Sequence, residues 1–376
     1  MKKLIITTFL MVLFFLKTIA IPRPDHVVVC ILENKGYPQI IGSSSAPYIN
    51  SLVPLSANLK KYYALTHPSQ PNYIMLYSGK NQGVTTNSTP SGTPWNTLNL
   101  GGSLINNGFT FKGYAEGLPS IGSTVSASGS YVRRHNPWVN WQGSGTNRIP
   151  RESNVPMTSW PTNFNSLPTV SFVVPNLNND MHDESISRGD TWVKTKLKTY
   201  IDWCKTHNSI FILMFDEDND HYGNRVVCLI MGMPIKTGSY STGYNHYDLL
   251  RTIEAIYGLP YAGQSFVGKT MTTIWKSVVT TDIEDNSYQI AHIVDPVVYP
   301  NPINLESILK YYSDESGTSE LSIYDISGRL VSTEVILTNV GENNYNFIKD
   351  ALRPGYYIYL IIRDDHNTQM GEFVFQ

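Results

Sequence analysis

The chain has 376 residues, of which 41% are hydrophobic and 15% are charged, and this is enough to bury a large core in two or three domains. Its formal net charge is −2. Because Lys and Arg are not in excess, the charge balance argues against nucleic acid as a partner.

Residues 1–20 have the pattern of a secretory signal peptide. Lys2 and Lys3 give a positive start, residues 4–16 are mostly apolar, and Thr18-Ile19-Ala20 resembles a small-residue cleavage site. The alternative is a membrane anchor, but the apolar run is shorter than the roughly 20 residues that a membrane span needs. We therefore expect a secreted or cell-surface protein without stable insertion in a membrane.

Residues 21–276 alternate predicted strands and helices, which is typical of an α/β domain. Four continuous apolar segments predict strands that are buried on both faces, as in a parallel or mixed sheet covered by helices. These segments are 26–32, 169–174, 209–215 and 225–231.

Helical periodicity predicts two helices in the second half of this domain. One covers 191–206 with Asp190 as its N-cap, and the other covers 246–257 and ends at Gly258. The segment 80–165 is instead rich in Gly, Ser, Thr, Asn and Pro. It predicts long loops and short strands that form a lid or pocket wall inserted in the α/β core.

The three cysteines are predicted to be buried thiols. Cys30 and Cys228 lie inside predicted core strands, and Cys204 lies on the apolar side of a predicted helix. An exported protein could pair two of them. Their surroundings instead favour free thiols that pack as small hydrophobic side chains, and their spacing fits no zinc motif.

The composition changes after residue 276. Residues 277–294 predict a linker, and residues 295–376 predict a small C-terminal β-sandwich, because short alternating strands are separated by Gly turns. Three blocks in this segment resemble the C-terminal sorting domain of the type IX secretion system. They are Tyr-Pro-Asn-Pro at 299–302, Ile-Tyr-Asp-Ile-Ser-Gly-Arg-Leu-Val at 323–331 and Leu-Arg-Pro-Gly-Tyr-Tyr at 352–357. The resemblance implies the secretion machinery as a partner.

The first candidate metal ligands directly follow the first predicted strand. Glu33 and Asn34 come after residues 26–32, and in open α/β sheets ligands bind at the carboxyl ends of strands. A carboxylate and an amide there offer oxygen ligands to a cation. A solvated loop with a helix cap is the alternative, which this block alone does not exclude.

Ser69 is the candidate nucleophile. It lies in the segment 66–74, where Pro71 suits the first turn of a helix. A helix N-terminus favours anions such as a phosphoryl group or an ionising alkoxide. A serine hydroxyl needs a base or a metal to become a nucleophile. Ser69 could instead be a simple N-cap, and the two roles are compatible.

Four acids in five positions follow the strand predicted at 209–215. They are Asp216, Glu217, Asp218 and Asp220. Such acids repel one another unless a cation neutralises them. An acidic surface turn and a calcium-binding loop are the alternatives. The position at a strand end, shared with Glu33, favours a catalytic metal.

Three histidines lie at the expected ends of elements, each beside polar residues. They are His135, His182 and His246. A lone histidine is usually structural. Three in such positions indicate roles in a functional site.

Several blocks, taken in order, resemble one family. It is the phosphoesterase family that includes bacterial acid phosphatases and non-haemolytic phospholipases C, within the alkaline phosphatase superfamily. The blocks are Glu33-Asn34, His67-Pro-Ser69-x-Pro-Asn72-Tyr73, Tyr114-Ala-Glu116-Gly-Leu-Pro119, His135-Asn-Pro137, Asp180-Met-His182-Asp183, Asp216-Glu217-Asp218 and a last block that starts at His246. Together they cover about residues 26–265.

The resemblance implies a three-layer α/β/α alkaline-phosphatase-like domain with Ser69 as a nucleophile that forms a phosphoseryl intermediate. Asn72 would help to balance charge on the phosphoryl group. His135 and His182 would contact the phosphoryl oxygens or the leaving group, with His182 as the proton donor. The expected metal ligands are Glu33, Asn34, Asp216 and Glu217, and the expected substrate-binding residues are His67, Glu116 and His246.

The chain also departs from its relatives. It lacks the long inserts of the phospholipase C branch, which disfavours a lipid substrate. It lacks the residue pairs typical of two-zinc alkaline phosphatases, which favours one divalent cation over two, although His246 leaves room for a second.

We therefore expect a secreted, metal-dependent phosphoric-ester hydrolase that acts on small phosphomonoesters through a phosphoserine. A phosphodiesterase or phospholipase C with the same site is one alternative. A non-enzymatic surface adhesin, suggested by the sorting tail and the Trp-rich loops, is the other. An adhesin would hydrolyse no phosphate ester and would leave the clusters at Ser69 and Asp216 unexplained.

Overall fold

The structure is a computed structural model with two separate hydrophobic clusters, one within residues 21–276 and one in the C-terminal segment. The described residues are 21–276, 296–299, 301–303, 307–313, 316–326, 329–346, 352–363 and 368–375. The predicted signal peptide at 1–20 and the predicted linker at 277–294 lie outside the described residues, so both stay predictions.

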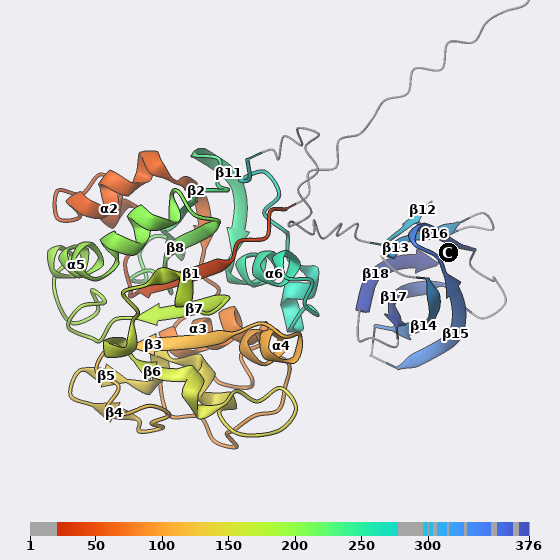
Figure 1. Ribbon diagram of the computed structural model, residues 1–376, viewed down its shortest axis with the longest axis horizontal. Helices are drawn as coiled ribbons and strands as arrows, with labels where there is room; N and C mark the ends of the chain where they lie inside the picture. The colour runs from red at the N-terminus through yellow and green to blue at the C-terminus, as the bar shows by residue number, and fades with distance from the viewer. Residues whose placement is uncertain are drawn as a thin grey trace, which may run out of the picture.

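A mixed sheet of nine strands runs through residues 21–276, in the order β11-β2-β10-β8-β1-β7-β3-β6, with β9 beside β2 (Figure 1). Its strands are β1 (His26–Leu32), β2 (Ala57–Tyr63), β3 (Phe111–Ala115), β6 (Asn154–Pro156), β7 (Val170–Val174), β8 (Ser209–Phe215), β9 (Arg225–Val226), β10 (Cys228–Gly232) and β11 (Gly238–Asn245). β9 and β10 are antiparallel to their neighbours, and the other pairs are parallel. The strands predicted at 26–32 and 209–215 are confirmed at both ends. The strand predicted at 169–174 begins one residue later, and 225–231 is divided into β9 and β10.

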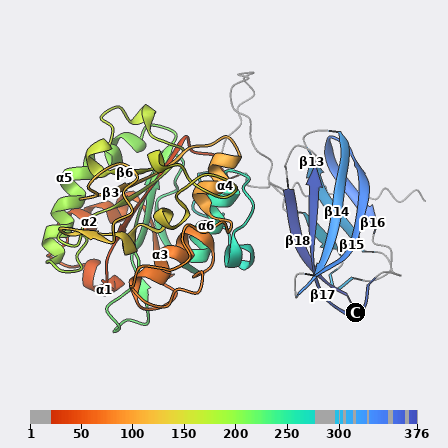
Figure 2. The ribbon, with the colours of Figure 1, turned by 90° about the horizontal axis from the view of Figure 1, so that it is seen from below.

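Helices cover both faces of this sheet (Figures 1 and 2). They are α1 (Tyr37–Ile40), α2 (Pro47–Leu52), α3 (Ser69–Ser78), α4 (Leu100–Asn106), α5 (Ile186–Cys204) and α6 (His246–Ile256). Tyr77 of α3 packs against Phe172 of β7, with 5.9 Å between ring centroids. Tyr200 of α5 packs against Phe211 of β8, at 6.3 Å. The register of β7, β1 and β8 aligns Phe172 with Ile212, so these two side chains point to the same face of the sheet. Phe211 is adjacent to Ile212 on β8, so its side chain points to the opposite face. The predicted three-layer α/β/α architecture is confirmed.

The helix predicted at 191–206 begins earlier than expected. α5 starts at Ile186, and the side chain of Ser185 accepts a backbone hydrogen bond as its N-cap. The prediction that Asp190 caps this helix is therefore wrong. The Asp190 carboxylate instead accepts two backbone N–H groups in the first turn of α2, at 3.0 and 2.7 Å. It caps a neighbouring helix, which a pattern along one segment could not indicate.

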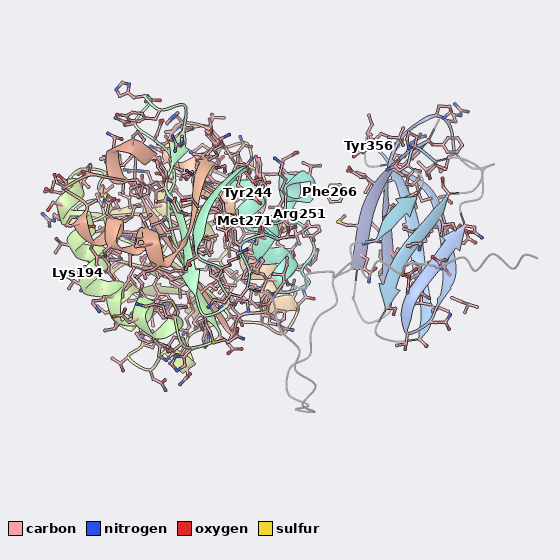
Figure 3. The ribbon with its side chains drawn as sticks, turned by 90° about the horizontal axis from the view of Figure 1, so that it is seen from above. Lys194, Tyr244, Arg251, Phe266, Met271 and Tyr356 are labelled. Atoms are coloured by element: carbon pink, nitrogen blue, oxygen red, sulfur yellow. The ribbon has the colours of Figure 1, made fainter. Side chains whose placement is uncertain are left out.

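The helix predicted at 246–257 is confirmed to within one residue as α6. Asn245 caps its start through two backbone N–H groups, and Gly258 follows its end with a φ of 63°. Arg251 on this helix donates to the carbonyl oxygen of Phe266 at 2.6 Å and so fastens the segment that follows (Figure 3).

The segment 80–165 forms long loops, short strands and 3-10 turns, as predicted. Besides β3 and β6 it contains a hairpin of β4 (Ala127–Ser128) and β5 (Tyr131–Val132). Trp138 is fully buried and donates from its ring nitrogen to Asn154 Oδ1 at 2.8 Å. It lies so close to Gly113 of β3 that a Cβ atom there would come within 2.0 Å of the indole ring. This packing anchors the loop that carries His135.

The three cysteines are buried and free, as predicted. Cys30 lies on β1, Cys204 at the end of α5 and Cys228 on β10. Burial raises the pKa of each thiol. The thiols therefore stay protonated and pack as small hydrophobic side chains.

The C-terminal segment forms two antiparallel sheets, β12-β13-β16 and β15-β14-β17-β18. Their strands are β12 (Val297–Tyr299), β13 (Ile308–Ser313), β14 (Gly317–Asp325), β15 (Leu330–Thr338), β16 (Gly341–Asn346), β17 (Gly355–Arg363) and β18 (Thr368–Phe375). Leu309 of the first sheet and Tyr359 and Phe373 of the second belong to one hydrophobic cluster, so the sheets pack face to face. The predicted β-sandwich is confirmed for the described residues. No helix in the described part of the chain is long and apolar enough to cross a membrane.

Candidate active site

The carboxyl ends of β1 and β8 bring two of the predicted blocks together. These strands are adjacent and parallel, and the backbone N–H of Asp216 donates to the carbonyl oxygen of Leu32 at 3.0 Å. Asn34 then turns sharply, with a φ of 46°, and its backbone N–H donates to Asp216 Oδ1 at 3.1 Å. The convergence expected for Glu33, Asn34 and Asp216 at one sheet edge is confirmed.

Ser69 is the first residue of α3, and its hydroxyl points into this acidic edge. Pro68 occupies the N-cap position and makes no side-chain cap, so Ser69 is not an N-cap. The Oγ of Ser69 lies 2.8 Å from Glu217 Oε1, 3.1 Å from Glu33 Oε2 and 3.3 Å from Asn34 Oδ1. One hydroxyl proton can serve one acceptor at a time. The surrounding oxygens therefore form a pocket suited to positive charge.

Asn72 and His67 hold the loop before Ser69 against Glu217. The Nδ2 of Asn72 donates to Glu217 Oε2 at 3.3 Å, and its Oδ1 accepts the backbone N–H of Thr66 at 3.2 Å. The Nδ1 of His67 lies 2.9 Å from Glu217 Oε2, and its Nε2 lies 3.3 Å from Asp218 Oδ1. The His67 side chain is 32% exposed. It therefore forms the solvent-facing rim at this side of the site.

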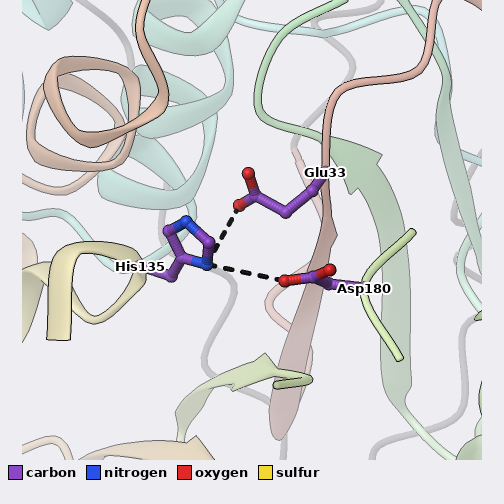
Figure 4. A group of neighbouring side chains, drawn as sticks. All are labelled: Glu33, His135 and Asp180. Carbon is purple, nitrogen blue, oxygen red and sulfur yellow. Dashed lines mark ion pairs between the residues drawn. The ribbon is translucent and has the colours of Figure 1, made fainter. Parts of the chain in front are cut away.

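A second group lies beside the first, formed by Glu33, His135 and Asp180 (Figure 4). The Nδ1 of His135 is 3.4 Å from Glu33 Oε1 and 3.6 Å from Asp180 Oδ2, and all three side chains are buried. The ring of His135 stacks on Tyr73, whose hydroxyl donates to Glu33 Oε1. Glu33 therefore contacts both groups, with one oxygen toward each.

His182 lies at the exposed side of this second group. Its backbone N–H donates to Asp180 Oδ1 at 2.8 Å, and its ring centroid is 6.4 Å from that of His135. The Nδ1 of His182 is 2.6 Å from Asp183 Oδ1, and the His182 side chain is 30% exposed. Asp183 therefore orients a ring that an incoming ligand can reach.

The other two predicted substrate-binding residues make their contacts within the protein. His246 is fully buried, with Nε2 2.7 Å from the carbonyl oxygen of Asp216 and Nδ1 3.0 Å from the Tyr62 hydroxyl. Glu116 accepts from Asn179 Nδ2 and from Trp192 Nε1, both at 2.9 Å. His246 supports the end of β8, and Glu116 supports the loop that leads to Asp180.

Asp180 and Lys35 are two site residues for which no role was predicted from the sequence. Asp180 follows β7, a neighbour of β1, so the strand-end rule that indicated Glu33 applies to it as well. Lys35 is half-buried beside the acids and donates from Nζ to the carbonyl oxygen of Met181 at 2.8 Å. Burial lowers the pKa of Lys35, an effect that the nearby Asp180 partly opposes. Lys35 therefore ties the loop that carries Asp180 to the end of β1.

Comparison with known proteins decides the family. A model of the phosphoesterase family matches residues 43–260, more than half of the chain. The chain belongs to the phosphoesterase family. A phosphatidylinositol-3-phosphatase of Mycobacterium tuberculosis is 42% identical over 261 residues, which are 68% of this chain and 84% of that protein. A probable acid phosphatase of Kluyveromyces lactis is 27% identical over 295 residues, 74% of this chain and 69% of that protein. The phosphoesterase is thus a hydrolase of phosphoric ester bonds.

The tail and the fold were compared in the same way. Residues 297–376 match a model described as a secretion system C-terminal sorting domain, which confirms the resemblance seen in the tail and indicates secretion or export to the cell surface. A solved structure of a protein in the alkaline phosphatase superfamily from Vibrio parahaemolyticus aligns with 92% of this chain and 82% of its own. Its sequence identity is 11% and the TM-score is 0.47, a remote likeness.

Burial dominates the electrostatics of the phosphoesterase site. It raises the pKa of four carboxyl groups, those of Glu33, Asp180, Asp216 and Glu217. For Glu33 the neighbouring charges of Asp216 and Asp180 add to this effect. Burial also lowers the pKa of His135 well below its usual range. Four ionised carboxylates in so buried a space need a positive counter-charge.

Unpartnered buried atoms show where such a charge would fit. Both ring nitrogens of His135 and the Oδ2 atoms of Asp180 and Asp216 have no hydrogen-bond partner among the described residues. A buried polar atom left unpaired costs about 1–3 kcal/mol. Carboxylate, amide and imidazole groups are typical ligands of divalent cations. The residues present therefore fit a divalent metal cation.

Proposed function

We propose that this phosphoesterase is a secreted, metal-dependent phosphomonoesterase that acts through a phosphoserine at Ser69. One observation carries the proposal. The Ser69 hydroxyl begins a helix and lies 2.8 to 3.3 Å from the side-chain oxygens of Glu217, Glu33 and Asn34. This arrangement supports a nucleophile that works beside a cation and a helix N-terminus.

The catalytic cation would be held by Glu33, Asn34, Asp216 and Glu217. When bound, it lowers the pKa of the serine hydroxyl and neutralises charge on a phosphoryl oxygen. The four side chains offer oxygen ligands, so they favour a cation that prefers oxygen. His246 would keep Asp216 in place through the contact with its carbonyl oxygen.

Ser69 would attack phosphorus in line with the leaving oxygen, so that the bond from Oγ to phosphorus forms as the bond to the leaving oxygen breaks. The nearest acceptor for the hydroxyl proton is Glu217 Oε1. The N-terminus of α3 would place partial positive charge beside the phosphoryl oxygens, and Asn72 would hold Glu217 in position. Water would then hydrolyse the phosphoserine.

His182 would protonate the leaving group. Its ring is partly exposed, and Asp183 orients it through Nδ1. His67, at the exposed rim, would contact the substrate. The buried contacts of Glu116 support a positioning role in place of the predicted substrate contact.

The names of the relatives favour a monoester substrate. Both relatives described above are named as phosphatases, one of them for a phosphoinositide. The substrate class therefore includes small phosphomonoesters and, as a second candidate, the phosphomonoester of a phosphatidylinositol phosphate. A phosphodiesterase with the same site is the enzymatic alternative.

The purified chain, stripped with a chelator and reloaded with single divalent cations, should be assayed on p-nitrophenyl phosphate, bis-p-nitrophenyl phosphate and phosphatidylinositol 3-phosphate in vesicles. We expect release of phosphate from the monoesters, dependent on the cation. Acid quenching during turnover should trap a phosphoryl group on the peptide that contains Ser69. Faster hydrolysis of the diester would support the phosphodiesterase, and no hydrolysis of any ester would support the adhesin.

A further inference from the structure

We propose that Glu33, His135 and Asp180 bind a second divalent cation, so that Glu33 bridges a centre of two cations. This inference extends the proposed function and rests on it for the first cation, the one beside Ser69. The ligands of the second site come from the end of β1, the loop before Trp138 and the loop after β7 (Figure 4).

The donor atoms of this second site are buried, and those of His135 and Asp180 are unpartnered in the described part of the chain. The side chains of Glu33, His135 and Asp180 are at most 1% exposed. Both ring nitrogens of His135 and the Oδ2 of Asp180 lack any hydrogen-bond partner among the described residues. The Oδ1 of Asp180 is occupied by the backbone N–H of His182, which fixes the carboxylate with Oδ2 toward His135.

The separations between these atoms suit ligands that share an ion better than direct hydrogen bonds. The Nδ1 of His135 is 3.4 Å from Glu33 Oε1 and 3.6 Å from Asp180 Oδ2. Direct N–H···O bonds are about 2.7–3.2 Å long. Two ligands at about 2.1 Å from a tetrahedral cation lie about 3.4 Å from each other.

The charges in this group also favour a bound cation. Two buried carboxylates face each other across one imidazole. Among the described residues, no Lys or Arg forms an ion pair with Glu33 or Asp180. The nearby Lys35 ammonium is held by the carbonyl oxygen of Met181. A buried carboxylate without a directly paired cation is costly, and a bound cation lowers that cost at both acids.

Glu33 lies between the two proposed sites and directs one carboxylate oxygen to each. Its Oε2 faces Ser69 at 3.1 Å, and its Oε1 faces His135 at 3.4 Å. The Tyr73 hydroxyl donates to Oε1, and the Tyr73 ring stacks on His135 at 5.1 Å between centroids, so one residue orients two of the ligands. One nitrogen and two oxygen donors favour Zn²⁺, Mn²⁺ or Fe²⁺ over Ca²⁺.

Metal counting tests this inference apart from activity. The purified chain would be stripped with a chelator, dialysed against Mn²⁺ and analysed for bound metal and by electron paramagnetic resonance. We expect two equivalents and a spin-coupled signal in the unmodified protein. His135→Gln and Asp180→Asn should each lose one equivalent and the coupling, and keep a mononuclear signal. The two changes are nearly isosteric, and circular dichroism with the melting temperature would confirm that each variant folds.

His182 provides the matched control. His182→Gln alters a histidine next to the same group that holds no cation in this proposal, so this variant should keep both equivalents and the coupled signal. One equivalent in the unmodified protein, unchanged in His135→Gln and Asp180→Asn, would overturn the second site and leave the proposed function standing. No bound metal in any variant would overturn both. Two equivalents that survive in His135→Gln would show that the second cation lies elsewhere and would reject this assignment.

Discussion

The Oγ of Ser69 lies 2.8 Å from the Oε1 of Glu217, across 148 residues of sequence. The contact joins the first residue of α3 to the segment that follows β8, so the nucleophile candidate and the acidic edge are fixed relative to each other by the sheet. Glu33 reaches the same hydroxyl from the neighbouring strand end. A substitution at Ser69 therefore removes the hydroxyl group while other residues hold the rest of the site in place.

Ser69→Ala should lower turnover by at least about 10³-fold, because removal of a nucleophile leaves only binding and charge stabilisation. The fold should persist, since Ser69 is not the N-cap of α3 and alanine suits the first helical turn. Steady-state assays on a monoester would measure the loss. Near-normal turnover in the variant would mean that water or another residue attacks phosphorus.

Removal of the metal should abolish hydrolysis and lower the melting temperature, because the buried carboxylates then lose their counter-charge and the mass-action stabilisation. A divalent cation should restore both. Ser69→Ala should keep the metal-dependent shift in melting temperature although it is inactive. Full activity in a preparation shown by elemental analysis to be metal-free would refute metal dependence.

Asp216→Asn should weaken metal binding by at least about 10-fold, and hydrolysis should fall with it. Asparagine can still accept the backbone N–H of Asn34, so the substitution removes the charge of Asp216 and leaves the turn at Asn34 intact. Isothermal titration with the metal would measure the affinity. Lost activity with an unaltered affinity for the metal would show that Asp216 acts on the substrate and is not a metal ligand.

Deletion of 295–376 should leave the purified enzyme active, because the hydrophobic cluster of the tail shares no residue with that of the catalytic domain and every candidate site residue lies before residue 277. In its host, the truncated protein should stay in the periplasm, since it lacks the sorting domain. Cell fractionation with activity assays would show both. A folded but inactive truncation would indicate that the tail completes the site.

Much of this fold could be predicted because its strands are buried on both faces. The apolar segments at 26–32 and 209–215 gave the exact bounds of β1 and β8. The strand-end rule then placed Glu33 and Asp216 at one edge, as the structure has them. Asp190 shows the limit of such reasoning, because its partner is the start of another helix and leaves no periodic signal along its own segment.

The strand-end rule could have indicated Asp180, which follows β7. The meeting of Glu33, His135 and Asp180 could not be predicted, because His135 comes from a segment without periodicity. His135 lies in a 3-10 turn that is placed by the burial of Trp138, and Asp180 lies six residues beyond β7. Only the packed loops bring them to Glu33. For the same reason, the sequence could not show that both ring nitrogens of His246 are engaged inside the protein.

Glu254 on α6 provides a test of stability against pH outside the acidic site. It is buried, it accepts from Ser265 Oγ at 2.6 Å and from the backbone N–H of Ala262 at 2.9 Å, and burial raises its pKa to about 8. Because the folded protein holds this proton more tightly than the unfolded chain, whose Glu pKa is about 4.3, Glu254 destabilises the fold progressively as pH rises from about 4.3 to about 8.

Glu254→Gln should remove this dependence, since its amide stays neutral and can still accept from Ala262 and donate to Ser265. We expect the melting temperature of Glu254→Gln, relative to the unmodified protein, to rise between pH 5 and pH 9. Glu152→Gln is the matched control, because the Glu152 side chain is 70% exposed, and it should follow the unmodified protein at every pH. Scanning calorimetry across this range would measure all three proteins. A constant difference between Glu254→Gln and the unmodified protein would show that Glu254 keeps the same charge in the folded and unfolded states, and that its two hydrogen bonds outweigh its burial.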